Sequence, residues 1–577
     1  MNSNSSSNSW FTLPTKSGVK ADSILAWATA ELINDSVLLE RVITHFQNEV
    51  RNASLSLSFD DRVTNSPALR CHAPFGSAFF LNLNLIELLG EIDQTSDGKS
   101  AILNWTDEAT RRGLFNHWAP WLTRDASIAI EISRPDALEI NDSLTPLGSL
   151  PIGSRNEPIS VLIDGSWLGE KETGSQRAAI EVIRKLQNSK NIKSISVFNL
   201  PSGFPDYATD ISELSKVKEV ELENARYSDI LWRPYQPSGE VNFRELNRYA
   251  KRIVMTYLDL IAYSNNKYHE SENSWLSYRS SLRLAAIRCD GIIAISNDVK
   301  NQLIENMPSV DSSRIYAIPL GTDHLSTGQD QSESARKIAG SNIVSQSYVL
   351  CLGTNFAHKN RDFAISAVEE VRRRGLSLDL VFAGLILDST NSGEDQELLK
   401  QNHFPSWVKT LGSVGHEDRD WLLANASVSI YPTSAEGFGL VPFESAAMNV
   451  PLVATKFGPL NELLAGQNLV EGWSVNDYAD AVIELVGKPE VRQSSITHTL
   501  KESERLTWTK CANEVVECFI EIASRDKSPA NIASNEFESL FNTVEQRFNE
   551  QVNAITSSFS WRITAPIRAL HKKLLGR

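Results

Sequence analysis

A strand, a glycine-containing loop and a helix follow one another in YPTSAEGFGLVPFESAAMNVPLVAT (431–455). The apolar run ends at Pro432, and Pro442 suits the first turn of a helix, where a missing N–H costs nothing. Gly437 and Gly439 allow the backbone to approach a ligand closely, and free N–H groups at a helix start favour an anion. The stretch therefore predicts a phosphate site between a buried strand and the next helix.

Two glutamates accompany this predicted phosphate site. Glu436 lies in the loop and Glu444 one turn into the helix, so both can point to the same edge of a sheet. A carboxylate beside a phosphate can accept hydrogen bonds from the hydroxyls of a sugar or a ribose. The alternative is that Glu436 only caps the helix and that Glu444 is a solvated surface residue. The combination of glycines, proline and glutamates favours the ligand site.

Short apolar runs alternate with helical stretches on both sides of this segment. Strands alternating with helices predict parallel sheets covered on both faces. Two doubly wound domains in tandem bind ligands at the carboxyl ends of their strands, so we expect a cleft between them. The expected strands are 159–168, 194–200, 229–235, 252–260, 291–296 and 314–321 in the first domain, and 347–353, 378–384, 408–413, 427–432 and 451–456 in the second.

The pattern divides the chain into five parts. We predict an α/β fold with two Rossmann-like domains that face a cleft, preceded by an accessory α/β or helical region of unknown role. The polar stretch TGQDQSESARKIAGSN (327–342) is interpreted as the linker between the two domains. The expected parts are 1–157 for the accessory region, 158–326 for the first domain, 343–488 for the second, 489–525 for C-terminal helices and 526–577 for an extension.

Composition limits the class of protein. Fifty-six Lys and Arg against 71 Asp and Glu give the 577 residues a net charge of −15, which argues against a general nucleic-acid binder. No stretch approaches the roughly 18 apolar residues that span a bilayer, and MNSNSSSNSW (1–10) lacks the features of a signal peptide. The five cysteines are scattered without metal-ligand spacing. We therefore expect a cytoplasmic protein.

The glutamate motif resembles that of a known family. EGFGLVPFE (436–444), with its glutamates eight residues apart, is similar to the paired-glutamate motif of retaining GT-B glycosyltransferases of family 4, and the resemblance covers roughly 159–525. In that family the first glutamate contacts the donor sugar and the second the nucleotide ribose. The resemblance thus implies these roles for Glu436 and Glu444. It also implies that the loop between them lines the donor site through Gly437, Phe438, Gly439 and Leu440.

A second matching stretch is VLCLGTNFAHKNRDFAISAV (349–368), where a strand ends at Gly353 and a helix opens near Lys359. A lysine there supplies a point charge to a diphosphate, whereas alone it would be a solvated surface residue. The resemblance makes Lys359 the diphosphate-binding lysine and places Gly353 and Thr354 in the donor site. Many relatives carry an arginine near this strand end, but the closest positions here are Thr354, Asn355 and His358. Val414 matches the position whose backbone contacts the nucleobase, although ordinary loop packing is an equal alternative.

The first domain resembles the family more loosely. LIDGSWLGEKETGSQRAAIEVI (162–183) is similar to the first strand, loop and helix, so that Gly174 and Ser175 would approach the donor phosphate or the acceptor. A simple tight turn is the alternative. In TYLDLIAY (256–263), Leu258 replaces a histidine common in relatives while Asp259 is kept. Asp259 is therefore a candidate catalytic residue that orients substrate, or a helix cap.

The resemblance implies sugar transfer from a nucleotide sugar to a saccharide, lipid-linked or protein acceptor, with retention of configuration, in a setting such as polysaccharide biosynthesis. Lys359 and backbone amides would stabilise the leaving diphosphate, so we expect neither a metal nor another cofactor. The alternatives are a nucleotide-sugar epimerase or hydrolase on the same architecture, and a non-catalytic sugar-binding scaffold.

The C-terminal extension is rich in positive charge. It ends in SFSWRITAPIRALHKKLLGR (558–577), a candidate basic amphipathic helix. Such a helix could lie on an anionic membrane, which would place the protein at the inner face of the membrane, or could pack on the acidic surface of the protein itself.

Overall fold

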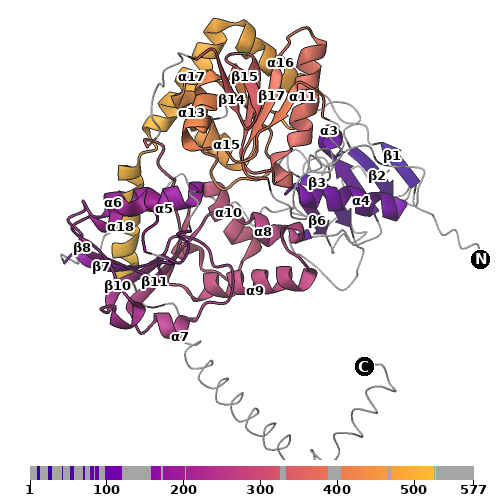
Figure 1. Ribbon diagram of the computed structural model, residues 1–577. Coiled ribbons are helices and arrows are strands. Elements are labelled where there is room, and N and C mark those ends of the chain that lie inside the picture. The colour runs from indigo at the N-terminus through magenta and orange to yellow at the C-terminus, as the bar shows by residue number, and fades with distance from the viewer. Residues whose placement is uncertain are drawn as a thin grey trace, which may run out of the picture.

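The structure is a computed structural model, and three large sheets form its framework (Figure 1). It describes residues 157–169, 173–201, 203–324, 333–386, 404–465, 469–525 and 527. Before residue 157 it describes 9–12, 24–28, 42, 52–57, 69–71, 78–82, 85–89, 92 and 98–119.

The first domain is built on a seven-stranded sheet in the order β13-β12-β11-β10-β7-β8-β9, and every pairing in it is parallel. All the strands expected between 159 and 321 belong to this sheet. The edge strand β9 was not predicted, because only the first of its three residues is buried. The strands are β7 (Ile159–Asp164), β8 (Ile192–Phe198), β9 (Val217–Glu219), β10 (Ser228–Arg233), β11 (Ala250–Tyr257), β12 (Gly291–Ala294) and β13 (Ile315–Ala317), and the main helices are α5 (Gly174–Leu186), α9 (Glu272–Arg288) and α10 (Asn297–Asn306).

The shorter helices of the first domain lie in its loops. They are η3 (Asp206–Ala208), α6 (Thr209–Ser212), η4 (Leu222–Asn224), α7 (Phe243–Leu246), α8 (Ile261–Ser264), η5 (Asn266–Tyr268) and η6 (Ser312–Arg314).

The second domain has a six-stranded parallel sheet in the order β18-β17-β16-β19-β20-β21. The strand order reverses on either side of β16, and the carboxyl ends of strands at such a point form a ligand crevice. The strands are β16 (Tyr348–Leu352), β17 (Asp379–Ala383), β18 (Val408–Thr410), β19 (Val428–Tyr431), β20 (Leu452–Thr455) and β21 (Leu469–Val470), and the helices are η7 (Ala357–Lys359), α11 (Arg361–Arg373), α13 (His416–Asn425), α14 (Val441–Ala447), α15 (Gly458–Leu463) and α16 (Val475–Gly487).

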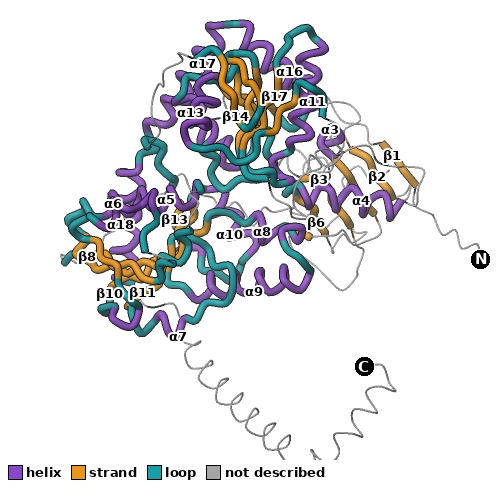
Figure 2. Tube along the Cα trace, viewed as in Figure 1, coloured by secondary structure: helices purple, strands orange, loops and turns teal. Residues whose placement is uncertain are grey.

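Both faces of this second sheet are covered by helices, as Figure 2 shows. Side chains alternate along a strand, so Val349 and Cys351 of β16 face the core that contains Phe363 of α11. Leu350 faces the opposite core, with Trp421 of α13. The predicted α/β class with two parallel sheets is confirmed.

The expected linker 327–342 is wrong for its second half. Residues Ala335–Ile338 and Ser341–Val344 form an antiparallel hairpin, β14 and β15. Ile338 and Ile343 are buried in the core of the second domain beside Leu350. Ala339 and Gly340 turn the chain with positive φ angles of 47° and 83°. The stretch 327–342 is mostly polar, so its composition did not indicate that Ile338, and Ile343 just beyond it, anchor a hairpin in the core.

The C-terminal helices are α17 (Pro489–Glu504) and α18 (Trp508–Ser524), as the helical pattern predicted. Helix α18 does not stay with the second domain: it crosses back to α5 of the first (Figure 1). Phe519 contacts Trp232 of β10 with ring centroids 5.7 Å apart. Gly291 of β12 leaves room for Ile522, because a Cβ there would stand 2.1 Å from the Cδ1 atom of Ile522. Helix α18, which follows the second domain in the sequence, thus packs on the first domain and connects the two.

The N-terminal region is a third body, with a mixed sheet in the order β1-β2-β5-β3-β6-β4. Its hydrophobic residues do not form a core of their own in the described part. Leu88 and Trp105 share one buried cluster with Phe363 and Trp473 of the second domain. The sequence predicted an accessory region but not this joint core. Its elements are β1 (Ser9–Thr12), β2 (Ile24–Ala28), β3 (Asn52–Leu57), β4 (Leu69–Cys71), β5 (Ala78–Asn82), β6 (Phe115–Ala119), α3 (Ile86–Leu89) and α4 (Gly98–Arg111).

Candidate functional site

Lys359 and Glu436 meet at the carboxyl edge of the second sheet. Lys359 ends the turn η7 after β16, and Glu436 lies in the loop after β19. The ammonium group of Lys359 forms an ion pair with Glu436 and donates to the hydroxyl of Tyr431 at 3.0 Å. That hydroxyl donates to Glu436 at 2.6 Å. The side chains of Lys359 and Glu436 are only 15% and 12% exposed, so neither is a solvated surface residue.

The turn that carries Lys359 is held tightly against the sheet. Gly353, with a φ of 128°, accepts a hydrogen bond at its carbonyl from Arg361, at 2.6 Å. The guanidinium of Arg361 also lies 5.0 Å from the centre of the Phe382 ring. Thr354 contributes its carbonyl to the same turn by accepting from the N–H of Phe356. Arg361 is a buried cation at this strand end, two residues beyond the lysine that sequence analysis singled out.

His358 does not supply the second positive charge. Burial, and next the charge of Lys359, hold the pKa of His358 well below its ordinary value, so the ring is neutral at pH 7. Its Nδ1 atom forms a hydrogen bond with the hydroxyl of Tyr268 from the first domain. The residue therefore joins the two domains beneath the site.

The loop 436–440 contacts the first domain directly. Ser296 donates its hydroxyl to the carbonyl of Gly437 at 2.7 Å. A Cβ atom on Gly437 would lie 1.8 Å from the carbonyl oxygen of Leu258, so only glycine fits between these backbones. Phe438 is buried in the hydrophobic core of the first domain. Gly439 has a φ of 90°, a conformation that glycine adopts without strain.

Asp259 follows β11 at this contact and has a clear structural role. Its carboxylate accepts the N–H of Ile261 at 2.9 Å, at the start of α8. Gln236 fixes the preceding turn by accepting the N–H of Leu258 at 2.7 Å and donating to the carbonyl of Asp259 at 3.0 Å. Burial raises the pKa of Asp259; the Ile261 N–H opposes this shift, and the charge of Glu436 adds to it. The capping interpretation thus has a contact that supports it.

A cavity of about 1000 Å³ opens between the two domains beside this loop. Gly174 at the start of α5 lines it from the first domain, and Val414, Leu440 and Glu444 line it from the second. Ser175 is not among the lining residues; its hydroxyl lies 3.0 Å from that of Thr173. Four residues that sequence analysis assigned to the donor site thus surround one cavity.

Two arginines that sequence analysis did not single out also line this cavity. Arg177 comes from α5 and Arg419 from α13. Arg419 forms an ion pair with Glu444 at 2.6 Å, and the Glu444 side chain is only 11% exposed, so Glu444 is not solvated. The acidic neighbours in HEDRD (416–420) made Arg419 resemble an ordinary surface charge. Only the fold shows that it faces Glu444.

His324 lines the same cavity as a neutral group. Burial, and next the charge of Arg177, lower the pKa of His324 to about 4. Its Nδ1 atom accepts a hydrogen bond from the indole of Trp508 at 2.8 Å. His324 thus connects the lining of the cavity to Trp508, the first residue of α18.

The chain is similar in sequence to known glycosyltransferases. Residues 346–488 match the family described as Glycosyl transferases group 1. The O-antigen chain mannosyltransferase B of Escherichia coli is 21% identical over 375 residues, 60% of this chain and 96% of that protein. The GPI3 subunit of the phosphatidylinositol N-acetylglucosaminyltransferase of Saccharomyces cerevisiae is 23% identical over 48% of this chain and 59% of that protein.

An uncharacterised glycosyltransferase of Methanocaldococcus jannaschii is 25% identical over 42% of this chain, and the match spans 63% of that protein's length. Among solved structures, Anabaena HepE in complex with UDP is 15% identical and covers 62% of this chain and 98% of its own, with a TM-score of 0.45. The sequence matches support a group 1 glycosyltransferase. The two parallel sheets, each covered by helices, are consistent with two Rossmann-like domains.

Proposed function

We propose that the chain is a glycosyltransferase that moves a sugar from a nucleotide-sugar donor to a hydroxyl group of an acceptor, with retention of configuration and without a metal. The observation that carries this proposal is the Lys359–Glu436 ion pair together with the interdomain cavity. The ion pair does not line the cavity, but the loop 436–440 leads from Glu436 to Leu440, which lines it with Glu444. The group 1 match spans Lys359, Glu436 and Glu444. We assign the sugar site to Glu436, the ribose site to Glu444 and the cation for the leaving group to Lys359.

Each glutamate that would hold the donor forms an ion pair with a cationic side chain. Glu436 is paired with Lys359, and Glu444 with Arg419. A donor would replace both ion pairs: its hydroxyls would give the carboxylates hydrogen bonds, and its diphosphate would give the cations a negative partner. Glu436 would then hold the sugar and Glu444 the ribose, while Val414 would lie against the base.

In the proposed reaction, the main task of the protein is to stabilise the negative charge of the leaving diphosphate. In a front-face reaction the bond from the anomeric carbon to the diphosphate breaks, and the bond to the acceptor oxygen forms on the same face. The acceptor proton passes to a diphosphate oxygen. Lys359, with Arg177 and Arg419 at the cavity, supplies positive charge where negative charge develops. Backbone N–H groups near Gly439 would add to it.

Metal independence follows from this assignment as a prediction. No group of three or more metal-ligating side chains occurs among the residues that the structure describes. Treatment with EDTA should leave at least about half of the transfer rate, because three cationic side chains are available to the diphosphate. A strict requirement for Mn²⁺ or Mg²⁺ would overturn the metal-free mechanism.

The proposed activity can be separated from its alternatives with one set of incubations. The protein is mixed with a panel of UDP-, GDP- and ADP-sugars, with and without saccharide acceptors. Released nucleotide is measured, and the anomeric configuration of the product is read by NMR. A glycosylated acceptor of unchanged configuration supports a retaining transferase, whereas an isomerised donor supports an epimerase. If no donor gives released nucleotide or altered sugar, the result would support a sugar-binding scaffold.

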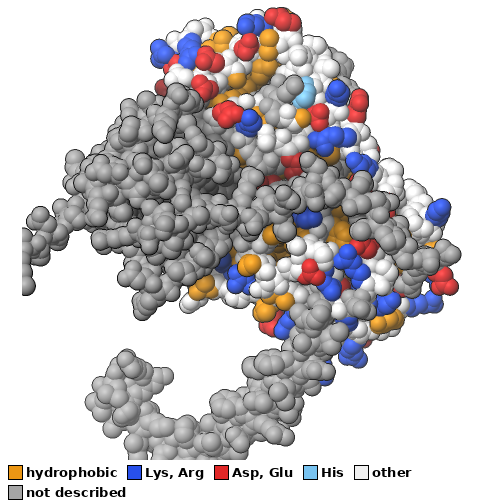
Figure 3. All heavy atoms as spheres, turned by 180° about the vertical axis from the view of Figure 1, so that it is seen from behind, with side chains coloured by type: hydrophobic (Ala, Val, Ile, Leu, Met, Phe, Trp, Pro, Cys, Tyr) orange, Lys and Arg blue, Asp and Glu red, His pale blue; other side chains and the backbone are white. Residues whose placement is uncertain are grey.

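The acceptor is proposed to be a saccharide, a lipid-linked saccharide or a protein, in the cytoplasm or at the inner face of the membrane. No helix in the described ranges has the length and apolarity needed to cross a bilayer. On the face that Figure 3 shows, Lys and Arg are interspersed with Asp and Glu, and no broad basic area suits a nucleic acid. The basic tail (558–577) lies outside the described residues. Co-sedimentation with anionic vesicles, with and without the tail, tests the membrane contact.

A further inference from the structure

Helix α4 of the N-terminal region ends against the two loops that carry the candidate catalytic pair. Its last residues are followed by Arg112, which is 3% exposed, and by Gly113, with a φ of 74°. A Cβ atom on Gly113 would stand 2.9 Å from the Cβ of Ala435, the neighbour of Glu436. The N-terminal region thus comes within one residue of the candidate sugar-binding glutamate.

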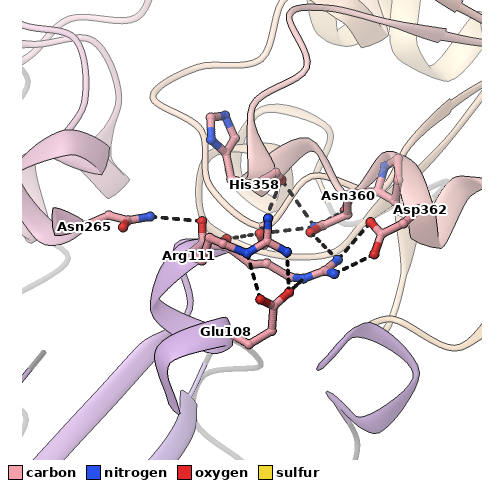
Figure 4. A network of polar contacts seen from close by, with 9 residues as sticks. Glu108, Arg111, Asn265, His358, Asn360 and Asp362 are labelled. Carbon is pink, nitrogen blue, oxygen red and sulfur yellow. Dashed lines mark hydrogen bonds and ion pairs between the residues drawn. The ribbon is translucent and has the colours of Figure 1, made fainter. Parts of the chain in front are cut away.

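The guanidinium of Arg112 binds the start of α11. It makes a two-pronged contact with Asp362, at 3.0 and 2.5 Å, and donates to the side-chain oxygen of Asn360 at 3.2 Å. Its Nε atom donates to Glu108, one turn back on α4, at 2.6 Å. Figure 4 shows this network, with Asn360 and Asp362 facing Glu108. Burial alone would lower the pKa of Arg112, but these two carboxylates raise it above its ordinary value.

The side chain of Asn360 connects Arg112 to both loops of the site through hydrogen bonds. The residue follows Lys359 directly and has a left-handed φ of 49°. Because Arg112 occupies its side-chain oxygen, its amide nitrogen points the other way and donates to the carbonyl of Pro432 at 2.8 Å and to Ser434 at 3.2 Å. The amide therefore bridges the lysine turn and the glutamate loop.

The backbone of α4 adds a second link to the same loop. The hydroxyl of Ser434 donates to the carbonyl of Arg112, and the N–H of Ser434 donates to the carbonyl of His358 at 2.8 Å. On the other side, Asn265 of the first domain donates to the carbonyl of Arg111 at 3.0 Å. The end of α4 thus binds both domains next to the Lys359–Glu436 pair.

We propose that Arg112 is a positioning residue for the Lys359–Glu436 pair, so that the N-terminal region completes the candidate catalytic site. The effect on catalysis rests on the proposed function, but the effect on the geometry of Lys359 does not. Arg112 contacts neither the cavity nor the paired side chains. It acts through Asn360, Asp362 and Ser434.

The main test replaces Arg112 with Lys, which keeps the positive charge but cannot make the two-pronged contact. Reactivity of Lys359 toward an amine-acylating reagent is measured by peptide mass spectrometry, with the exposed Lys456 as internal reference. We expect the labelling of Lys359 relative to Lys456 to rise by about threefold or more, since a lysine released from its carboxylate partner is more reactive. Arg112→Ala should give a larger change if it folds.

The matched control is Glu87→Ala. Glu87 also joins the N-terminal region to the second domain, by accepting the N–H of Val475 at the start of α16 rather than by binding the Lys359 turn. This variant should weaken docking without changing the Lys359 labelling ratio. Equal labelling ratios in Arg112→Lys and wild type would overturn the positioning role. An equal rise in Glu87→Ala would show that docking alone matters, and would also overturn it.

Kinetics separate this proposal from the proposed function. If wild type transfers sugar, Arg112→Lys should lower kcat by about tenfold while nucleotide affinity stays within about twofold, because misplacement affects the reacting groups and not the cavity. An unchanged kcat would count against Arg112. If wild type transfers no sugar, the proposed function fails, and the labelling experiment still decides the position of Lys359.

Discussion

The two parallel sheets contribute to the candidate site by different means. The second sheet supplies charged side chains: Lys359, Glu436, Glu444 and Arg419 stand at its carboxyl edge in two ion pairs. The first sheet supplies mainly backbone where the two meet, through the Leu258 carbonyl that closes on Gly437. Around the loop 436–440 the second domain thus supplies the ion pairs and the first domain mainly shape, although Arg177 of α5 adds a charge at the cavity. These parts should respond differently to substitution.

The largest effect should come from breaking the contact where the domains meet. Gly437→Ala would put a methyl group 1.8 Å from the Leu258 carbonyl, so the backbones must separate. We expect transfer to fall by about a hundredfold, the size typical of a misplacement near 1 Å at reacting groups. Steady-state kinetics measure the loss.

Gly487→Ala is the matched control for this substitution. A Cβ atom there meets nothing within 4 Å, and the residue ends helix α16. Its kinetics should equal those of wild type. Full activity in Gly437→Ala would mean that the closed contact is not needed for transfer.

The charged side of the comparison is tested by Lys359→Ala. We expect turnover to fall by about tenfold or more, equivalent to about 1.4 kcal/mol of barrier, because the leaving diphosphate would lose a cation proposed to stabilise it. Folding should change little, since Glu436 keeps its hydrogen bond from Tyr431. Lys456→Ala is the control, because Lys456 follows the neighbouring strand β20 and pairs with the exposed Glu471. Equal turnover in the two variants would remove Lys359 from the site.

The same contrast explains what the sequence could predict. Glu436, Glu444 and Lys359 have charged side chains at meaningful spacing, and the structure brings them to one edge. Arg112 lies 247 residues from Lys359 in the sequence, and no spacing rule connects them. The hairpin at 335–344 and the joint core of the N-terminal region depend on single apolar residues whose partners are distant.

That joint core also changes the expectation for a truncation. The units matched by the family resemblance are complete without residues 1–150, so the sequence suggested that a shortened chain would fold. Removing the region would expose Phe363 and Trp473, both 2% exposed or less, and would leave Asp362 without its arginine. We therefore expect the chain lacking residues 1–150 to be poorly soluble, as measured by its soluble yield. A monodisperse truncated protein with a sharp melting transition would contradict this.

A smaller effect is expected at Glu444, the proposed ribose contact. Glu444→Gln keeps the shape of the side chain but removes the charge that pairs with Arg419. Nucleotide binding should weaken by roughly fivefold, the size of one hydrogen bond of about 1 kcal/mol, while kcat with saturating donor stays close to wild type. Calorimetric titration with UDP, GDP and ADP measures it. Unchanged affinity for the nucleotide that binds wild type would contradict the ribose role.

The smallest effect on transfer should come from Asp259, on the side of the site that supplies shape. Capping the start of α8 needs only a side-chain oxygen, which Asp259→Asn retains, whereas orienting a substrate by charge needs the carboxylate. We expect kcat to stay within about twofold of wild type, because the structure uses this carboxylate to accept the Ile261 N–H.

The stability difference between Asp259→Asn and wild type should nevertheless depend on pH. Burial, as the largest cause, raises the folded-state pKa of Asp259 above its unfolded value, so the ionised carboxylate costs stability at neutral pH. That cost is absent below the unfolded pKa of about 3.9 and grows as the pH rises toward the folded value. Asp259→Asn should therefore melt at a higher temperature than wild type at pH 8, and the difference should vanish near pH 4. A large loss of kcat at pH 8 would show instead that the negative charge orients the substrate, and the first sheet would then contribute chemistry as well as shape.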